Sequence, residues 1–231
     1  MTKLREDVLV SSSPLVFLVD VDDTLLDNDR IRVDFEEHLR AAYGEEARAA
    51  YWAIQERRFV ELGFRDYLGA IQEWWTSARW DPALLPFAEY ALAYPYAERL
   101  YPGALGALTA LRVSGPVVVL TDGDAVFQAW KVTRAGIRDA ADAVLVYVHK
   151  EEELDDVERR HPARHYVLVD DKLRILTAAK EHWGERVTTV LPLQGQFAND
   201  PEVTARYPPA DVTVSGIAEL SGIKLEALGR V

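Results

Sequence analysis

The chain has 231 residues, of which 49% are hydrophobic and 28% charged, so it can bury a substantial core without disulfide or metal staples. It contains no cysteine, which excludes disulfides, thiolate metal sites and cysteine nucleophiles. Its 38 acidic and 26 basic residues give a net charge of -12, which disfavours nucleic acid and favours a small-molecule partner.

The beginning of the chain and its hydropathy suggest a cytoplasmic protein. The first 14 residues mix both charges and lack the apolar stretch of a secretory signal. No apolar run approaches the roughly 20 residues that span a bilayer, so we expect no membrane partner. The composition leaves the oligomeric state open.

The first predicted element is a buried strand at residues 15–19, a short apolar run that ends at Asp20. Residues 28–100 then show helical spacing, for example at Phe35 and Leu39, and no convincing strand. This segment is predicted to be a small all-helical cap domain inserted after the first strand.

Strands and helices alternate after the insertion. Apolar runs predict further strands at 117–120, 144–148, 167–169, 187–191 and 212–214. Helices are expected at 104–112, 125–135 and 174–183, and a turn-rich loop at 194–209. The alternation predicts an α/β fold, a Rossmann-like parallel sheet with helices on both faces, formed by residues 1–27 and 101–231.

An acidic cluster follows the first strand in the stretch VFLVDVDDTLLDN. Because alternate side chains of an extended chain point the same way, Asp20 and Asp22 can face one small volume. The pair suits a nucleophile and a proton donor. A simpler interpretation is that these acids only begin a solvated turn.

Polar groups also follow three other predicted strands, which argues against the simple turn. Parallel strands end at one edge of the sheet, so these groups should converge with Asp20 and Asp22. They are Asp170 with Asp171, Thr121 with the turn at Asp122 and Gly123, and Lys150. Amides of the glycine turn could face an anion. Together the groups are suited to metal-assisted phosphoryl transfer.

A divalent cation is needed if this acidic site is to accept a phosphate, because the carboxylates alone would repel it. The candidate ligands are all oxygens, and the five histidines lack the paired spacing of a zinc motif. The sequence therefore predicts Mg²⁺ as the cofactor.

The order of these motifs resembles that of the haloacid dehalogenase-like hydrolases. DVDDTL, LTDGD, the separated Lys150 and VLVDD are similar to the four motifs of the family, and the match spans the chain. The insertion after the first motif resembles the helical cap of the family's phosphatases.

This resemblance assigns roles to the residues. Asp20 would attack phosphorus and form an aspartyl-phosphate, while Asp22 would act first as acid and then as base. Thr121, Asp122, Gly123 and Lys150 would bind the substrate, with Thr121 and Lys150 on the transferring oxygens. The Mg²⁺ ligands would be Asp20, the backbone carbonyl of Asp22 and Asp171, with Asp170 behind them.

The lysine assignment departs from the family pattern, because Glu151 replaces the proline common after this lysine. Lys172 and Lys131 are the alternatives. Lys172 directly follows the acidic pair, whereas Lys131 lies within a predicted helix and is expected to be a solvated surface charge.

Phosphatase is the reaction that these residues favour. A departing alkoxide needs a proton, which Asp22 can supply, whereas a departing halide does not. The expected reaction is therefore hydrolysis of a small phosphorylated metabolite. A phosphomutase of the same fold and a non-catalytic phospho-ligand-binding module are alternatives.

The cap carries residues that could select a substrate. The candidates are Arg57, Arg58 and the tryptophans Trp74, Trp75 and Trp80. We favour a role in packing over a role in substrate binding. Aromatic residues at helical spacing usually pack inside a helical bundle, and adjacent arginines usually lie on its solvent-exposed surface.

Overall fold

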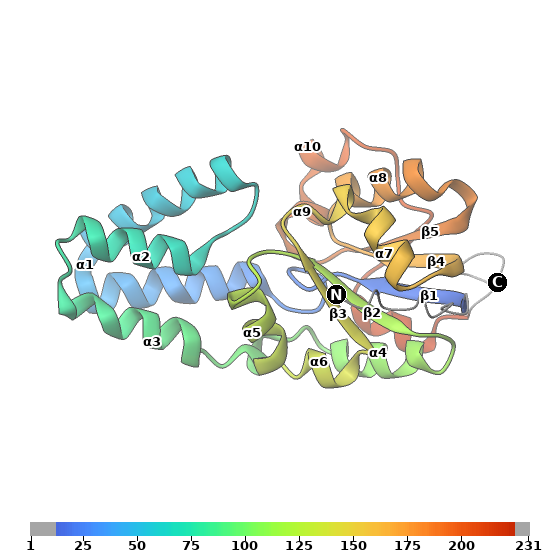
Figure 1. Cartoon of the computed structure of the whole chain (residues 1–231), viewed down its shortest axis with the longest axis horizontal. Helices are drawn as coiled ribbons and strands as arrows, with labels where there is room; N and C mark the ends of the chain where they lie inside the picture. The colour runs from blue at the N-terminus through green and yellow to red at the C-terminus, as the bar shows by residue number, and fades with distance from the viewer. Residues whose placement is uncertain (1–12, 225–231) are drawn as a thin grey trace, which may run out of the picture.

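The computed structural model describes residues 13–224 and shows a sheet domain beside a helical segment (Figure 1). The expectation about the first residues falls largely outside this range. Within the described residues, no helix combines the length and apolar character needed to cross a membrane.

The sheet has six parallel strands in the order β3-β2-β1-β4-β5-β6, which confirms the predicted α/β class. The strands are β1 (Ser13–Val19), β2 (Val117–Asp122), β3 (Ala143–Tyr147), β4 (Ala163–Val169), β5 (Val187–Pro192) and β6 (Val212–Val214). β1 lies between β2 and β4, so the residues that follow these three strands meet at one edge.

Side chains along β1 alternate between the two faces of the sheet and contribute to the apolar core on each face. Leu15, Phe17 and Val19 enter one apolar cluster, while Val16 and Leu18 enter the other. Burial on both faces explains why β1 is a continuous apolar run in the sequence.

Helices cover the two faces of the sheet (Figure 1). One face packs against α4 (Ala104–Arg112), α5 (Phe127–Arg134) and α6 (Ile137–Ala140). The other packs against α7 (Leu154–Arg160), α8 (Leu173–Trp183) and α9 (Gly195–Asn199). The remaining short helices are α10 (Pro201–Thr204), η1 (Pro82–Leu84), η2 (Tyr96–Arg99), η3 (Lys150–Glu152), η4 (Gly184–Arg186) and η5 (Ile217–Gly222).

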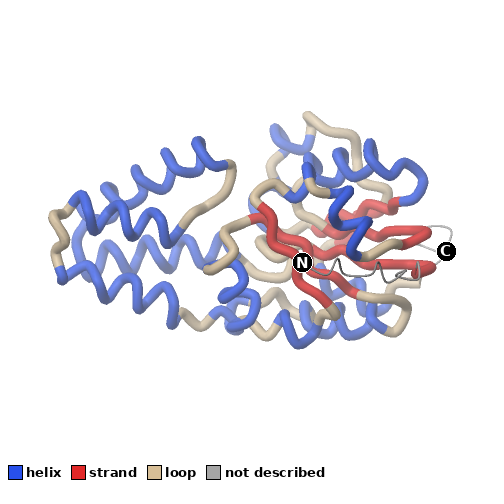
Figure 2. The backbone as a smooth tube through the Cα atoms, in the orientation of Figure 1, coloured by secondary structure: helices blue, strands red, loops and turns tan. Residues whose placement is uncertain are grey.

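The segment between β1 and α4, called the cap below and comprising residues 28–100, contains only helices and loops (Figure 2). Its main helices are α1 (Asn28–Leu62), α2 (Tyr67–Ser77) and α3 (Leu85–Ala93). Two helical segments of α1 meet at Gly44, whose backbone has φ 87° and ψ 172°. The chain reverses there, and α1 returns toward the sheet domain (Figure 1).

Aromatic side chains form the centre of the cap. The ring of Phe87 lies 5.1 Å from that of Tyr51 and 6.0 Å from that of Trp74, both in edge-to-face geometry. Trp74 is buried, as expected for a packing residue, whereas Trp80 is 62% exposed.

The cap joins the sheet domain through two adjacent chain segments. Leu26 pairs with Leu100 in an isolated antiparallel bridge, and the Asp27 amide donates to the Arg99 carbonyl over 2.8 Å. α1 begins immediately after this crossing, with the Asp27 side chain accepting a hydrogen bond from the Arg30 amide.

Several elements differ from the sequence predictions. The segment 194–209, expected to be a loop, contains α9 and α10, and α7 was not predicted. These helices have only four to seven residues, too few for a clear helical period. The predicted helix at 125–135 is shorter, because Asp124 accepts from the Val126 and Phe127 amides before α5 begins.

Candidate active site

Asp20 lies directly after β1 and is almost completely buried. The ammonium of Lys150 lies 2.5 Å from Oδ1 of Asp20 and 2.6 Å from Oδ2 of Asp170. Burial alone would lower the pKa of Lys150, but the carboxylates of Asp170 and Asp20 outweigh it and hold the pKa above its usual range. Lys150 therefore stays a cation between two strand ends.

Asp20, Asp170 and Asp171 each offer a carboxylate oxygen within 4.8 Å of the others. Both carboxylate oxygens of Asp171 are buried and have no hydrogen-bond partner among the described residues. Burial raises the pKa of Asp171 well above its usual range, and Lys172, with its ammonium 3.8 Å away, only partly opposes this. A hard divalent cation fits this all-oxygen donor set, since it would supply the missing partner of Asp171.

Thr24 links the first and fourth of the predicted motifs. Its hydroxyl accepts the Asp171 amide over 3.1 Å and lies 3.4 Å from Oδ2 of Asp20. The sequence patterns above predict no role for Thr24. Its place in the DVDDTL stretch, four residues after Asp20, was the available signal.

The Asp22 side chain contacts two residues of α5. Its Oδ1 lies 2.6 Å from the Lys131 ammonium, and its Oδ2 accepts from the Gln128 amide nitrogen over 3.2 Å. The expectation that Lys131 is a solvated surface charge is wrong, because its side chain is only 2% exposed. α5 packs Lys131 against the strand edge, where Asp22 satisfies the buried ammonium.

Thr121 and Asp122 are the last two residues of β2 and Gly123 follows it, and their polar groups already have partners. Gln128 donates to the Thr121 hydroxyl over 2.7 Å, and the Asp122 carboxylate accepts the Lys150 amide over 2.8 Å. The Gly123 amide donates to the Tyr147 carbonyl over 2.9 Å. This amide is therefore not free to bind an anion, contrary to the expectation from the sequence.

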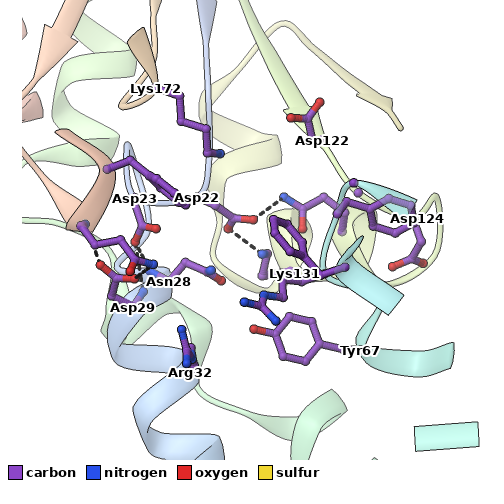
Figure 3. A pocket seen from close by; sticks show the side chains of 18 of the residues that line it. Asp22, Asp23, Asn28, Asp29, Arg32, Tyr67, Asp122, Asp124, Lys131 and Lys172 are labelled. Atoms are coloured by element: carbon purple, nitrogen blue, oxygen red, sulfur yellow. Dashed lines mark hydrogen bonds and ion pairs between the residues drawn. The ribbon is translucent and has the colours of Figure 1, made fainter. Parts of the chain in front are cut away.

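A cavity of about 320 Å³ lies between the cap and these strand ends, within the usual size of a small-molecule site. Asp22 and Lys131 face Tyr67 and Arg32 across it (Figure 3). The sheet domain also contributes Lys172, Arg174 and Phe197 to its wall. Lys172 is thus a cavity residue, whereas Lys150 contacts Asp20 directly.

The cap residues singled out in the sequence do not line this cavity. Arg57 pairs with Glu61 and Glu73 on an exposed surface, and Arg58 pairs with Asp66. The cap residues that do line it are Asn28, Asp29, Arg32, Phe59, Gly63, Phe64, Arg65 and Tyr67. Most of them lie in or near the turn between α1 and α2. Gly63 indicates this turn in the sequence, but the sequence does not show that the turn lies over the sheet.

Comparisons with known proteins agree with this architecture. Residues 15–186 match the family model for haloacid dehalogenase-like hydrolases. A haloacid dehalogenase-like hydrolase from Burkholderia xenovorans LB400 is 48% identical, with 92% of this chain and 99% of that chain covered and a TM-score of 0.87. No curated protein sequence matches.

Two more distant structures share the fold. The magnesium-bound HAD-hydrolase YfnB from Bacillus subtilis is 17% identical, with 90% of this chain and 97% of that chain covered and a TM-score of 0.60. L-2-haloacid dehalogenase from Xanthobacter autotrophicus is 18% identical, with the same coverage and a TM-score of 0.59.

Proposed function

Since the chain belongs to the haloacid dehalogenase-like hydrolases, we propose that it hydrolyses a small phosphate monoester with Mg²⁺ through an aspartyl-phosphate on Asp20. The observation that carries this proposal is the position of Asp22. Its carboxylate lines the cavity and is held there by Lys131 and Gln128. A proton donor and acceptor thus stands where a leaving group would lie.

Asp20, Asp170 and Asp171 would hold the metal ion, together with the backbone carbonyl of Asp22. When bound, Mg²⁺ supplies positive charge that offsets the carboxylates and the phosphate. The buried, unpartnered oxygens of Asp171 support this assignment.

Asp20 is the proposed nucleophile. Lys150 orients its carboxylate through the 2.5 Å contact and offers a cation to the phosphoryl oxygens. The attacking oxygen of Asp20 forms a bond to phosphorus while the bond to the leaving oxygen breaks. Thr121 would donate its hydroxyl to a phosphoryl oxygen, with Gln128 fixing the position of that hydroxyl.

Asp22 would serve both half-reactions. It gives a proton to the leaving alkoxide and later takes one from the water that cleaves the aspartyl-phosphate. Lys131 and Gln128 keep its two oxygens directed into the cavity during these exchanges.

Dehalogenation is the main alternative within the family, because L-2-haloacid dehalogenases share the fold. A halide leaves without a proton, so that reaction gives Asp22 no role in its first step. It also gives no role to the Asp171 carboxylate, which accepts no hydrogen bond from the described residues, because a carbon–halogen bond brings no dianion that a metal must offset.

Turnover of phosphate esters by the parent and by Asp20→Asn tests the proposal. With Mg²⁺, the parent should release inorganic phosphate from aryl and small alkyl phosphates, and a chelator should abolish the release. Asp20→Asn should lower kcat at least about a thousandfold, because the nucleophile is lost.

The exposed control Asp139→Asn should keep parental kcat. Release of halide from 2-haloacids without phosphate release would show a dehalogenase instead. Transfer of the phosphoryl group only to a second sugar would show a mutase. Unchanged turnover in Asp20→Asn would refute the assignment of the nucleophile.

A further inference from the structure

Charged side chains line both walls of the active-site cavity, and those of the sheet side include the cations Lys131, Lys172 and Arg174. On the sheet side, every acidic side chain that lines it has a partner: Asp22 pairs with Lys131, and Asp23, Asp122 and Asp124 accept backbone amides. On the cap side, the charged residues are Arg32, Arg65 and Asp29. Asp29 is occupied, since it accepts two hydrogen bonds from Gln196. The cap wall therefore presents positive charge.

Arg32 and Arg65 retain donors for a ligand. Arg32 makes a contact from Nε to Glu36 over 3.2 Å, and Arg65 makes one from a terminal nitrogen to Glu56 over 2.9 Å. A guanidinium carries five N–H donors, so most donors of each are unused by the described residues. The two glutamates are partly or largely exposed, which weakens both ion pairs by solvent screening.

Aromatic rings hold both guanidinium groups in place. Cζ of Arg65 lies 4.6 Å from the ring centre of Phe59, and Cζ of Arg32 lies 5.3 Å from that of Trp52. Stacking on a ring limits the motion of a guanidinium and leaves its edge open to an oxyanion.

Tyr67 adds an independent feature that points to a ligand. Its side chain is 3% exposed, it lines the cavity, and its hydroxyl has no hydrogen-bond partner among residues 13–224. The ring packs against Phe127 with centroids 5.3 Å apart, which fixes the direction of the hydroxyl. The hydroxyl and Arg32 lie on the same side of the cavity, opposite Asp22 (Figure 3).

We propose that Arg32, Arg65 and Tyr67 bind a second anionic group on the substrate, so that the enzyme selects phosphate monoesters whose leaving group carries a carboxylate or another oxyanion. This inference rests on the proposed function for the position of the phosphate. The phosphoryl group would lie at the sheet edge near Lys150. The leaving group would extend past Asp22 toward the cap, where the three side chains meet its far end.

Binding of three non-hydrolysable phosphonates, measured by calorimetry with Mg²⁺, tests this directly. The probes are 3-phosphonopropionate, 3-hydroxypropylphosphonate and 3-aminopropylphosphonate, which differ in the charge of the distal group. The parent should bind the carboxylate probe at least about tenfold more tightly than the neutral one, and the cationic probe most weakly.

Arg65→Gln, Arg32→Gln and Tyr67→Phe should each reduce this preference while changing the affinity of the neutral probe little. Arg57→Gln is the matched control, since Arg57 is a cap arginine that does not line the cavity, and it should keep the preference. Equal binding of the three probes by the parent would overturn the inference. So would a uniform loss of affinity in all three variants.

Because phosphonates are not turned over, this outcome is separate from the test of catalysis. Active hydrolysis without a charge preference would refute the recognition site alone. Charge-selective binding without hydrolysis would refute the phosphatase alone.

Discussion

The carboxylate of Asp171 lies in an environment that a bound cation would stabilise. Its two oxygens are buried and accept no hydrogen bond from the described residues, and burial raises its pKa. Its neighbours behave similarly: burial raises the pKa of Asp170 to about 6 and that of Asp23 to about 7. Such groups are costly to ionise in the folded protein unless a cation compensates them.

The stability of the metal-free protein should therefore depend on pH. These carboxyls have raised pKa values in the folded state, so the folded protein binds more protons than the unfolded chain between about pH 4 and 7. Their stabilising contribution is complete below about pH 4 and is lost as pH rises through the folded values. Without metal, the melting temperature should fall over this window, and Asp171→Asn should make the fall shallower.

At pH 7, Asp171→Asn should raise the free energy of unfolding of the metal-free protein by about 1 to 3 kcal/mol, because the variant lacks a buried carboxyl that is costly to ionise. Added Mg²⁺ should stabilise the parent but not this variant. Asp139→Asn, at an exposed position of α6, should change neither result. Urea unfolding with and without Mg²⁺ measures both effects. A metal-free Asp171→Asn protein less stable than the parent would show that the buried Asp171 carboxyl does not destabilise the fold.

The residues near Asp20 show what the sequence can and cannot predict. The strand-end carboxylates follow recognisable apolar runs, so their convergence could be anticipated from the parallel topology. Lys131 could not be interpreted correctly, because a lysine inside a helix looks the same in sequence whether it faces water or Asp22. Only the packing of α5 against the strand edge decides between them.

Among the elements, α1 depends on one residue for its shape. Gly44 has φ 87° and ψ 172°, a conformation essentially restricted to glycine, and it lets two helical segments of α1 lie in one bundle. A Cβ at this position would meet no atom within 4 Å, so any cost of substitution comes from the backbone alone.

Gly44→Ala should lower the free energy of unfolding by about 1 to 3 kcal/mol through this backbone strain. Gly222→Ala is the matched control, because its Cβ would also enter open space but its φ is ordinary. Chemical denaturation of both variants measures the difference. Equal stability of the two variants would show that the reversal in α1 tolerates a side chain.

For the cap, the sequence predicts that helices form but not how they are arranged. Helical spacing indicates the helices themselves, whereas it does not indicate which of their residues face the sheet. The reversal at Gly44 and the turn at Gly63 bring Arg65 and Tyr67 to the cavity. Sequence spacing alone instead drew attention to Arg57, Arg58 and the tryptophans, which lie elsewhere on the cap.

At the scale of the whole molecule, the cap and the sheet domain meet over the strand ends. The contacts include Gly63 against His149, where a Cβ would collide with the imidazole, and Gln196 against Asp29. The two crossing segments at Leu26 and Leu100 connect the parts on one side. This arrangement places the cavity between the two parts, where a bound substrate would be shielded from bulk water.

Trapping the phosphorylated enzyme would identify the residue that carries the phosphoryl group, which we propose is Asp20. An aryl phosphate has a good leaving group and does not need the acid, whereas the second step still needs Asp22 to activate water. In Asp22→Asn with Mg²⁺, an acid-quenched reaction should therefore contain phosphorylated enzyme, and peptide mass spectrometry should place the group on Asp20. A phosphoryl group on another residue, or its persistence in the Asp20→Asn, Asp22→Asn double variant, would show that Asp20 is not the nucleophile.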